Sequence, residues 1–455
     1  MKKDLTTGSV FKNIIYFSLP YMLSYFLQTL YGMADLFIVG RFNGTQSITA
    51  VSIGSQVMHM LTVMIVGLAM GTTVTVGRAI GEKQNEKAGK AVGNTVTVFL
   101  AGSAVLTVIL LCLVKPIVSV MSTPAEAVEE TRAYLTICFI GIPFITAYNI
   151  ISSIFRGLGD SKNPMYFIAV ACVFNIALDY LFIGYFKMGA AGAALGTTLS
   201  QTVSVIVSLI AMKKLNIGIK LKKSDFKPDK KTVGSLFKIG VPVAAQDGFI
   251  QISFLIITII ANGRGLTDAA AVGIVEKIIG MMFIIPSSML SSVSALAAQN
   301  IGAKEYGRAK QTLKYAIMLA TGIGLVIAVI TQFFALNIVG IFEKDPEVIA
   351  HGAQYLRSYV FDCVFAGIHF CFSGYFCAME RSGISFLHNS LSIVFVRIPM
   401  AYLMSKMFTQ TLFPMGLAAT CGSVLSVIIC VIEYVIITRK TAVAKNQGIE
   451  QGRTQ

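Results

Sequence analysis

The chain has 455 residues, of which 55% are hydrophobic and 13% are charged, and its formal net charge is +15. A soluble domain usually carries about 25% charged residues, so this composition does not supply a water-exposed surface. The eight cysteines are scattered through apolar stretches without CxxC spacing. That pattern favours small buried side chains over disulfides or a metal centre. Composition therefore excludes an ordinary soluble protein and indicates an integral membrane protein.

About twelve apolar stretches are long enough to cross a bilayer, whose hydrocarbon core needs roughly 20 helical residues. Helices are expected because lipid offers the backbone no hydrogen-bond partner, and the stretches are too continuous for a membrane β-barrel. No small-residue cleavage site follows the first stretch, so we expect that helix to be retained. The sequence predicts spans at 14–39, 52–77, 92–114, 133–155, 164–185, 190–212, 236–261, 269–297, 315–336, 354–376, 386–405 and 415–437.

Lysine and arginine alternate in density from one connecting segment to the next. If the N-terminus is inside, 27 of the 37 basic residues lie in cytoplasmic segments, eight lie outside, and Lys277 and Arg397 fall within spans. Basic residues concentrate on the cytoplasmic side of membrane proteins, so this bias predicts that both termini are cytoplasmic. It also accounts for most of the positive charge without a nucleic-acid partner.

The longest basic stretch divides the chain in the middle and contains Pro228. We expect an N-terminal six-helix lobe over 1–212 and a basic cytoplasmic linker over 213–235 that contacts anionic lipid headgroups. A C-terminal six-helix lobe over 236–440 and a polar cytoplasmic tail over 441–455 complete the predicted domains.

The two halves repeat each other at an offset of about 221 residues. Gly81, Lys83 and Ala88 are matched by Gly302, Lys304 and Ala309, and Phe155 is matched by Phe376. An even number of spans per half gives both halves the same orientation, related by a pseudo-two-fold axis along the membrane normal. This all-α, two-lobe plan predicts an alternating-access carrier with a cavity between the lobes.

Three motifs resemble the multidrug and toxic compound extrusion (MATE) family. They are residues 18–41 (SLPYMLSYFLQTLYGMADLFIVGR), 155–160 (FRGLGD) and 298–309 (AQNIGAKEYGRA). The resemblance covers roughly residues 10–440. It implies a V-shaped, two-lobe antiporter that exports organic, often cationic, compounds in exchange for protons or sodium ions.

Two aspartates lie within predicted spans of the first half. A carboxylate at the bilayer centre costs about 2.5–3.5 kcal/mol on insertion scales, so its retention indicates a function. Asp35 and Asp179 lie near the outer ends of their helices, and Asn175 is one turn from Asp179 on the same face. Thr197 and Thr198 enter the next helix to a similar depth. Such a carboxylate pair can take up a proton outside and release it inside.

This set resembles the N-lobe cation site of the DinF-like branch of the MATE family. The resemblance assigns ion or proton coupling to Asp35, Asn175, Asp179 and Thr198. The alternative is a polar network that only fixes helix packing.

The repeat offset places Ile257, Val396 and Met400 opposite Asp35, Asn175 and Asp179, so the second half does not duplicate the set. The NorM-like branch would place an acid where Ile250 and Gln251 stand, which disfavours that branch and its sodium coupling.

Weaker candidates for the substrate cavity are Gln28, Tyr31, Asp247, Glu276, Met282 and Asp362. We expect Arg397 to neutralise an internal acid, and His59 and His369 to be buried, hydrogen-bonded imidazoles rather than proton relays.

No nucleotide-binding loop or catalytic constellation occurs, so no enzyme and no cofactor are expected, only H⁺ or Na⁺ as the coupling ion. The leading prediction is an H⁺-coupled antiporter of organic cations in the cytoplasmic membrane, acting as a monomer. The alternative is a flippase of lipid-linked oligosaccharide or peptidoglycan precursors. A flippase needs several basic residues around a pyrophosphate, and this chain places more acids than bases within its spans.

Overall fold

The computed structural model describes residues 4–215, 218–219 and 221–451, with side chains described up to residue 439. Over these residues the chain is helical and contains no strand. Eleven helices there are long and apolar enough to cross a membrane, and a pair bent by 47°, Ala125–Ile140 with Ile142–Gly157, makes twelve. The predicted all-α membrane class and the number of spans are confirmed.

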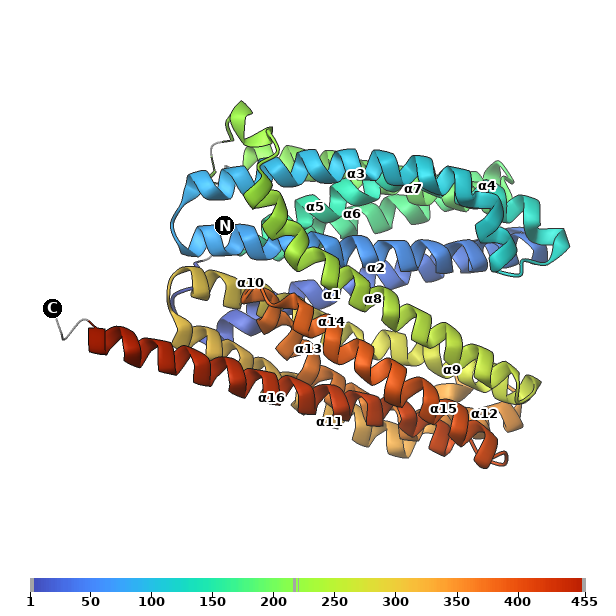
Figure 1. Ribbon diagram of the computed structural model, residues 1–455. Coiled ribbons are helices and arrows are strands. Elements are labelled where there is room, and N and C mark those ends of the chain that lie inside the picture. Colours follow the sequence, from blue (N-terminus) through green and yellow to red (C-terminus); the bar gives the residue numbers. More distant parts are fainter. Residues whose placement is uncertain (1–3, 216–217, 220, 452–455) are drawn as a thin grey trace.

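The helices form two consecutive groups, one for each half of the chain (Figure 1). The first lobe contains α1 (Val10–Phe42), α2 (Thr45–Gly81), α3 (Asn85–Val120), η1 (Ala125–Ala127), α4 (Val128–Ile140), α5 (Ile142–Gly157), α6 (Lys162–Asp179), η2 (Tyr180–Tyr185) and α7 (Gly189–Lys214). A short helix η3 (Lys223–Phe226) follows. The second lobe contains α8 (Lys230–Asn262), α9 (Leu266–Met282), α10 (Ile284–Gly302), α11 (Tyr306–Gly340), α12 (Pro346–Tyr359), α13 (Asp362–Ala378), α14 (Ser382–Ser392), η4 (Ile393–Arg397), α15 (Ile398–Met407) and α16 (Phe413–Gln451).

The helices extend beyond the predicted spans because their ends continue through polar residues outside the apolar stretch. The N-cap of α1 is Ser9, whose hydroxyl accepts a hydrogen bond from the Lys12 N–H. The helical path breaks between α4 and α5, because Pro143 at the start of α5 has no N–H to donate to a carbonyl of α4. Two π-helical turns break the regular helical spacing: η2 follows α6, and η4 lies between α14 and α15.

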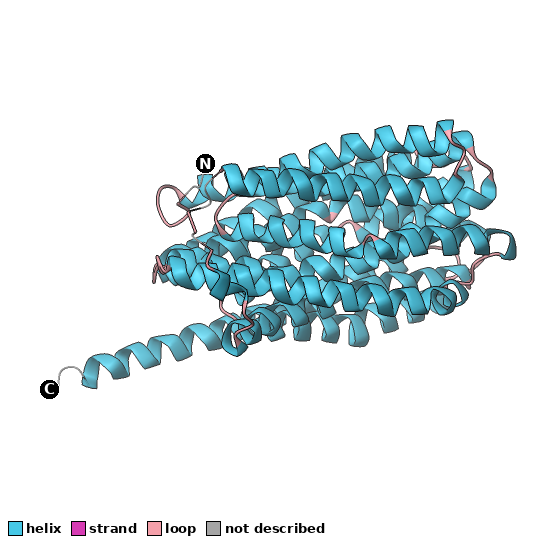
Figure 2. Cartoon of the chain, turned by 90° about the horizontal axis from the view of Figure 1, so that it is seen from above, coloured by secondary structure: helices cyan, strands magenta, loops and turns pink. Residues whose placement is uncertain are grey.

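Each lobe has its own hydrophobic core at one end of the bundle, and the lobes share a core at the other end. The separate cores are built around Tyr134 and Phe139 in the first lobe and around Tyr355 and Tyr359 in the second. The shared core joins α1 and α2 to α10, α11 and α13. Figure 2 shows the helices running nearly parallel.

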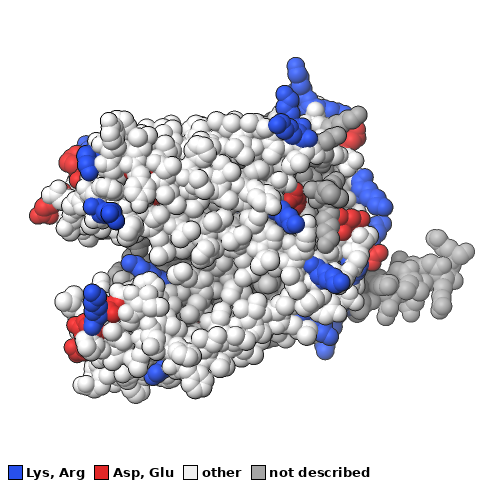
Figure 3. All heavy atoms as spheres, turned by 180° about the vertical axis from the view of Figure 1, so that it is seen from behind, with Lys and Arg blue, Asp and Glu red and all other residues white. Residues whose placement is uncertain are grey.

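Charged side chains gather at the two ends of the molecule and leave a broad uncharged belt between them (Figure 3). Large apolar side chains such as Leu19, Phe37 and Phe333 are exposed. An exposed apolar surface of this extent is expected of a chain surrounded by lipid. Figure 3 also shows a hollow between the lobes that is open at one end.

The end of the bundle opposite the hollow, which we call the closed end, is held by reciprocal contacts between repeat-equivalent residues of α2 and α10. A Cβ placed on Gly81 would lie 2.0 Å from the Gln299 carbonyl oxygen, and one on Gly302 would lie 2.2 Å from that of Arg78. Arg78 also forms an ion pair with Glu380, which follows α13. Because only glycine permits such a close backbone approach, these two positions close the gap between the lobes.

The linker segment lies against the first lobe. Asn94 of α3 donates to the Asp225 carbonyl at 2.9 Å and accepts from the Asp229 N–H at 2.6 Å. The helix α8 begins at Lys230, inside the stretch expected to be linker.

Candidate functional site

Three helices of the first lobe bring the predicted coupling residues together. Asp35 of α1, Asn175 and Asp179 of α6, and Thr197 of α7 have interacting side chains, and the Thr197 hydroxyl donates to Asp35 Oδ2 at 3.1 Å. Asp35 is 4% exposed, and Asn175 and Asp179 are fully buried. Thr198 is also buried, but its hydroxyl lies beside Gly141 rather than on a carboxylate.

Local backbone features create the space for Asp179. It is the last residue of α6, immediately before the π-helical turn η2. A Cβ on Gly196 of α7 would lie only 2.2 Å from Asp179 Oδ1. The buried carboxyl therefore occupies the volume that a side chain at position 196 would need.

The polar atoms of this site are largely without hydrogen-bond partners in the described structure. They include Asp35 Oδ1, both oxygens of Asp179, both polar atoms of the Asn175 amide and Thr198 Oγ1. Burying such atoms unpaired is costly, and two adjacent carboxylates repel each other when both are ionised. An added proton or monovalent cation relieves both costs, so the arrangement suits reversible cation binding.

Replacing Gly196 with alanine should lower the stability of the folded protein. The new methyl group overlaps Asp179 Oδ1, and overpacking of this kind costs about 1–3 kcal/mol. The measurement is thermal unfolding of the purified protein. Gly273→Ala is the matched control, because no heavy atom lies within 4 Å of a Cβ built there. Equal unfolding temperatures for the two variants would contradict the close approach of Gly196 to Asp179.

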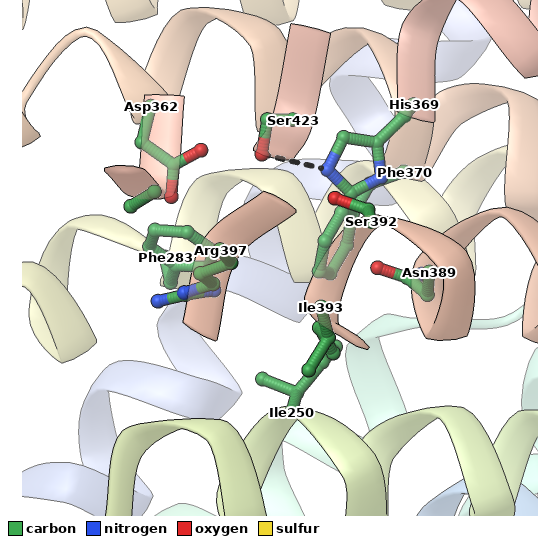
Figure 4. A pocket seen from close by; sticks show the side chains of 11 residues that line it. Ile250, Phe283, Asp362, His369, Phe370, Asn389, Ser392, Ile393, Arg397 and Ser423 are labelled. Carbon is green, nitrogen blue, oxygen red and sulfur yellow. Dashed lines mark hydrogen bonds between the residues drawn. The ribbon is translucent and has the colours of Figure 1, made fainter. Parts of the chain in front are cut away.

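The second lobe contains a polar cavity that the sequence did not reveal (Figure 4). Its lining combines charged, polar and apolar side chains: Ile250, Phe283, Asp362, His369, Phe370, Asn389, Ser392, Ile393, Arg397, Ala419 and Ser423. Asp362 is fully buried, and both its oxygens lack a hydrogen-bond partner in the described structure. The second lobe therefore has chemistry of its own, although it does not repeat the Asp35–Asn175–Asp179 set.

Arg397 lies in the π-helical turn η4 and is 7% exposed. It donates a hydrogen bond to the Tyr359 hydroxyl and its guanidinium lies 4.9 Å from the centre of the Phe254 ring. Among the described residues it forms no ion pair. Asp362 lines the same cavity and, like Glu276, interacts with the Arg397 charge through space. The expected neutralisation of an internal acid is therefore a through-space interaction, and the guanidinium itself packs on aromatic faces.

Two histidines occupy the interior of the second lobe. His369 Nε2 lies 3.3 Å from the Ser423 hydroxyl, as expected for a buried, hydrogen-bonded imidazole. His388, which sequence reasoning overlooked, lies with its ring centre 5.4 Å from that of His369 and its Nε2 2.9 Å from the Ser373 hydroxyl. His59 is exposed on α2, so the expectation of a buried imidazole is wrong there. Only the three-dimensional packing of α13, α14 and α16 reveals that His369, His388 and Ser423 are neighbours.

The remaining cavity candidates are distributed over both lobes. Gln28 lines a second small pocket in the first lobe, whereas Tyr31 and Met282 pack against hydrophobic cores. Glu276 accepts a hydrogen bond from the Thr258 hydroxyl at 2.9 Å. Asp247 lies at the junction of the lobes, since its carboxylate would be 3.0 Å from a Cβ on Gly67 of α2. The structure does not bring these residues into one site.

The sequence matches one protein-family model, MatE, over residues 20–181 and again over 242–403. The two matched stretches are equal in length and cover the two halves, so the comparison also supports the internal repeat.

Curated relatives match over most of their length. The chain is 30% identical to the "Probable multidrug resistance protein YoeA" of Bacillus subtilis, over 75% of this chain and 76% of that protein. It is 24% identical to the "Multidrug export protein MepA" of Staphylococcus aureus, over 88% and 89% of the two chains. A solved structure described as the outward-facing conformation of a multidrug resistance MATE family transporter aligns with a TM-score of 0.90 and 22% identity, covering 97% of this chain and 98% of that one.

Proposed function

The chain belongs to the MatE family, which consists of transporters rather than enzymes, and on this premise we propose that it is a cation-coupled antiporter. It would export organic cations across the cytoplasmic membrane by alternating access, with H⁺ as the coupling ion. The observation that carries the proposal is the buried Asp35–Asp179 pair, which lies in one lobe only. Asp35 Oδ1 and both carboxylate oxygens of Asp179 lack hydrogen-bond partners in the described structure.

The shape of the molecule suggests how transport would proceed. The hollow between the lobes would face outward, and the closed end would face the cytoplasm, in keeping with the basic segments there and with cytoplasmic termini. Protonation of Asp35 and Asp179 from outside would shift the lobes and release the substrate. Opening of the closed end would then let the protons leave inward and a new substrate enter.

The substrate class rests on the relatives and on charge. The relatives' names refer to multidrug resistance and multidrug export. Asp247 at the junction of the lobes and Glu276 beside Thr258 are further acidic groups, and acids attract organic cations. A single chain contains both lobes, so we propose that it acts as a monomer surrounded by lipid.

Transport in proteoliposomes tests the coupling ion. Purified protein in vesicles with an acidic lumen should accumulate ethidium from a neutral medium, because protons leaving the vesicle drive the dye inward. A sodium gradient of equal size, without a pH gradient, should give no accumulation above protein-free vesicles. Accumulation driven only by sodium would overturn the choice of H⁺, and accumulation under neither gradient would overturn antiport of this dye.

The flippase alternative is less well supported. A pyrophosphate headgroup needs several converging basic side chains. The second-lobe cavity contains Arg397 together with Asp362, and the coupling site of the first lobe contains two acids.

A further inference from the structure

A second small pocket lies within the first lobe, away from the Asp35–Asp179 site. It is formed by α1, α2 and α5 and is lined by Tyr21, Ser24, Tyr25, Gln28, Val66, Asn149 and Arg156. No carboxylate lines it. Arg156 is the residue before the C-terminal Gly157 of α5, whose carbonyl accepts a hydrogen bond from Gln299 of the other lobe. The pocket is therefore adjacent to the closed end.

Arg156 is a buried cation without an anionic partner. Its side chain is 7% exposed, and among the described residues it forms neither an ion pair nor a hydrogen bond, with Nε fully enclosed and unpaired. Its guanidinium lies 4.1 Å from the centre of the Tyr21 ring, which compensates part of the charge. The other buried arginine among the described residues, Arg397, is also 7% exposed, but it donates a hydrogen bond to the Tyr359 hydroxyl. An unpartnered buried guanidinium is costly, so its retention indicates a ligand that supplies the missing charge.

The rest of the lining offers hydrogen-bond donors. Tyr21 is 2% exposed, and its hydroxyl has no hydrogen-bond partner in the described structure. The Gln28 side chain can present its amide N–H groups to the same space. Asp247 of α8 and Arg156 both interact with Tyr25 through space, but Asp247 does not line the pocket. The pocket thus differs from the second-lobe cavity, where Arg397 faces Asp362.

We propose that this pocket binds a carboxylate or similar anionic group of the transported compound, with Arg156 and Tyr21 as its ligands. The guanidinium presents donors in a planar fork that fits such groups. Tyr21 and Tyr25, with ring centres 5.1 Å apart, offer aromatic faces to the body of the same molecule. The inference rests on the proposed function and deepens it: substrates would include zwitterionic amphiphiles as well as simple cations.

Two dyes that differ by one ester test this proposal. Rhodamine B carries a cationic xanthene and a free carboxylate, and in rhodamine B ethyl ester the carboxylate is masked. Binding of each to the purified full-length protein in detergent is measured by fluorescence anisotropy, without any ion gradient. We expect the wild type to prefer rhodamine B. Arg156→Gln should weaken rhodamine B binding by about 10-fold or more while changing ester binding less than about 2-fold.

Three further variants distinguish the effects of the hydrogen bond, the planar guanidinium and the charge. Tyr21→Phe should weaken rhodamine B alone by about 2- to 10-fold, since one hydrogen bond is lost and the ring under Arg156 is kept. Arg156→Lys should retain part of the preference, because the charge remains without the fork. Lys162→Gln removes an exposed cation of the same lobe, 4.5 Å from the Tyr16 ring, and should leave both affinities unchanged.

The outcomes separate this proposal from the proposed function. Equal affinities for the two dyes in the wild type, or equal losses of both in Arg156→Gln, would overturn the anion site. Displacement of rhodamine B by added phosphatidylglycerol would assign the pocket to a lipid phosphate and overturn the substrate assignment. If the Arg156-dependent preference is found but vesicles transport no dye under a pH gradient, the antiport proposal fails and the binding site stands.

Discussion

Replacing Asp35 or Asp179 with asparagine should reduce dye efflux to the level of cells without the protein, a loss of about 10-fold or more. Asparagine fills the same volume but cannot bind or release a proton, so the step that couples the lobes to the gradient is removed. The two carboxyls interact with each other and are buried, so water cannot replace the proton-binding group that either variant lacks. The measurement is ethidium efflux from energised cells at equal expression.

Asp345→Asn is the control for that experiment. Asp345 is the N-cap of α12 and accepts from the Glu347 N–H at 2.9 Å. Asparagine caps a helix about as well as aspartate, so this variant removes a carboxylate without disturbing the fold. Undiminished efflux in both Asp35→Asn and Asp179→Asn would remove the pair from the mechanism.

Alanine at Gly81 or Gly302 should impair transport by preventing the closed end from forming. Each new methyl group would lie 2.0 or 2.2 Å from a carbonyl oxygen of the facing helix, so α2 and α10 must separate. Cores tolerate such overlaps poorly. We expect dye efflux to fall about 5-fold or more in each variant. Both variants should lose transport because the two contacts are repeat equivalents.

Spin labels on Gln84→Cys and Glu305→Cys, in a background with Cys112→Ser, report the separation of the lobes. Double electron–electron resonance should show a longer distance in Gly81→Ala and Gly302→Ala than in the parent. Gly322→Ala of α11 is the control, since no heavy atom lies within 4 Å of a Cβ there. Distances and efflux equal to those of Gly322→Ala would show that these glycines do not hold the lobes together.

The helical plan and the first-lobe site followed from short-range regularities. Apolar length gave the spans, and the i, i+4 relation placed Asn175 and Asp179 on one face. Helix depth placed both Thr197 and Thr198 at the level of Asp35. The resemblance assigned Thr198, whereas in the structure the Thr197 hydroxyl contacts Asp35. The space for Asp179 was not predictable, because it depends on the approach of Gly196 from another helix.

The second-lobe cavity and the Arg156 pocket were missed for a different reason. Asp362, Asn389 and Ser423 of the cavity lie on three helices. Arg397 lies in the π-helical turn η4, where regular helical spacing does not predict that its side chain is buried. The span predicted from apolar length ends at residue 155, which places Arg156 in a loop. In the structure α5 continues to Gly157 and buries the guanidinium.

The central claim is that the Asp35–Asp179 pair couples proton entry to substrate exit. Ethidium accumulation in acid-filled proteoliposomes, compared between wild type and the double variant Asp35→Asn/Asp179→Asn, tests it most directly. The account predicts pH-driven accumulation by the wild type and none above protein-free vesicles by the double variant. Equal pH-driven accumulation by both proteins would contradict it.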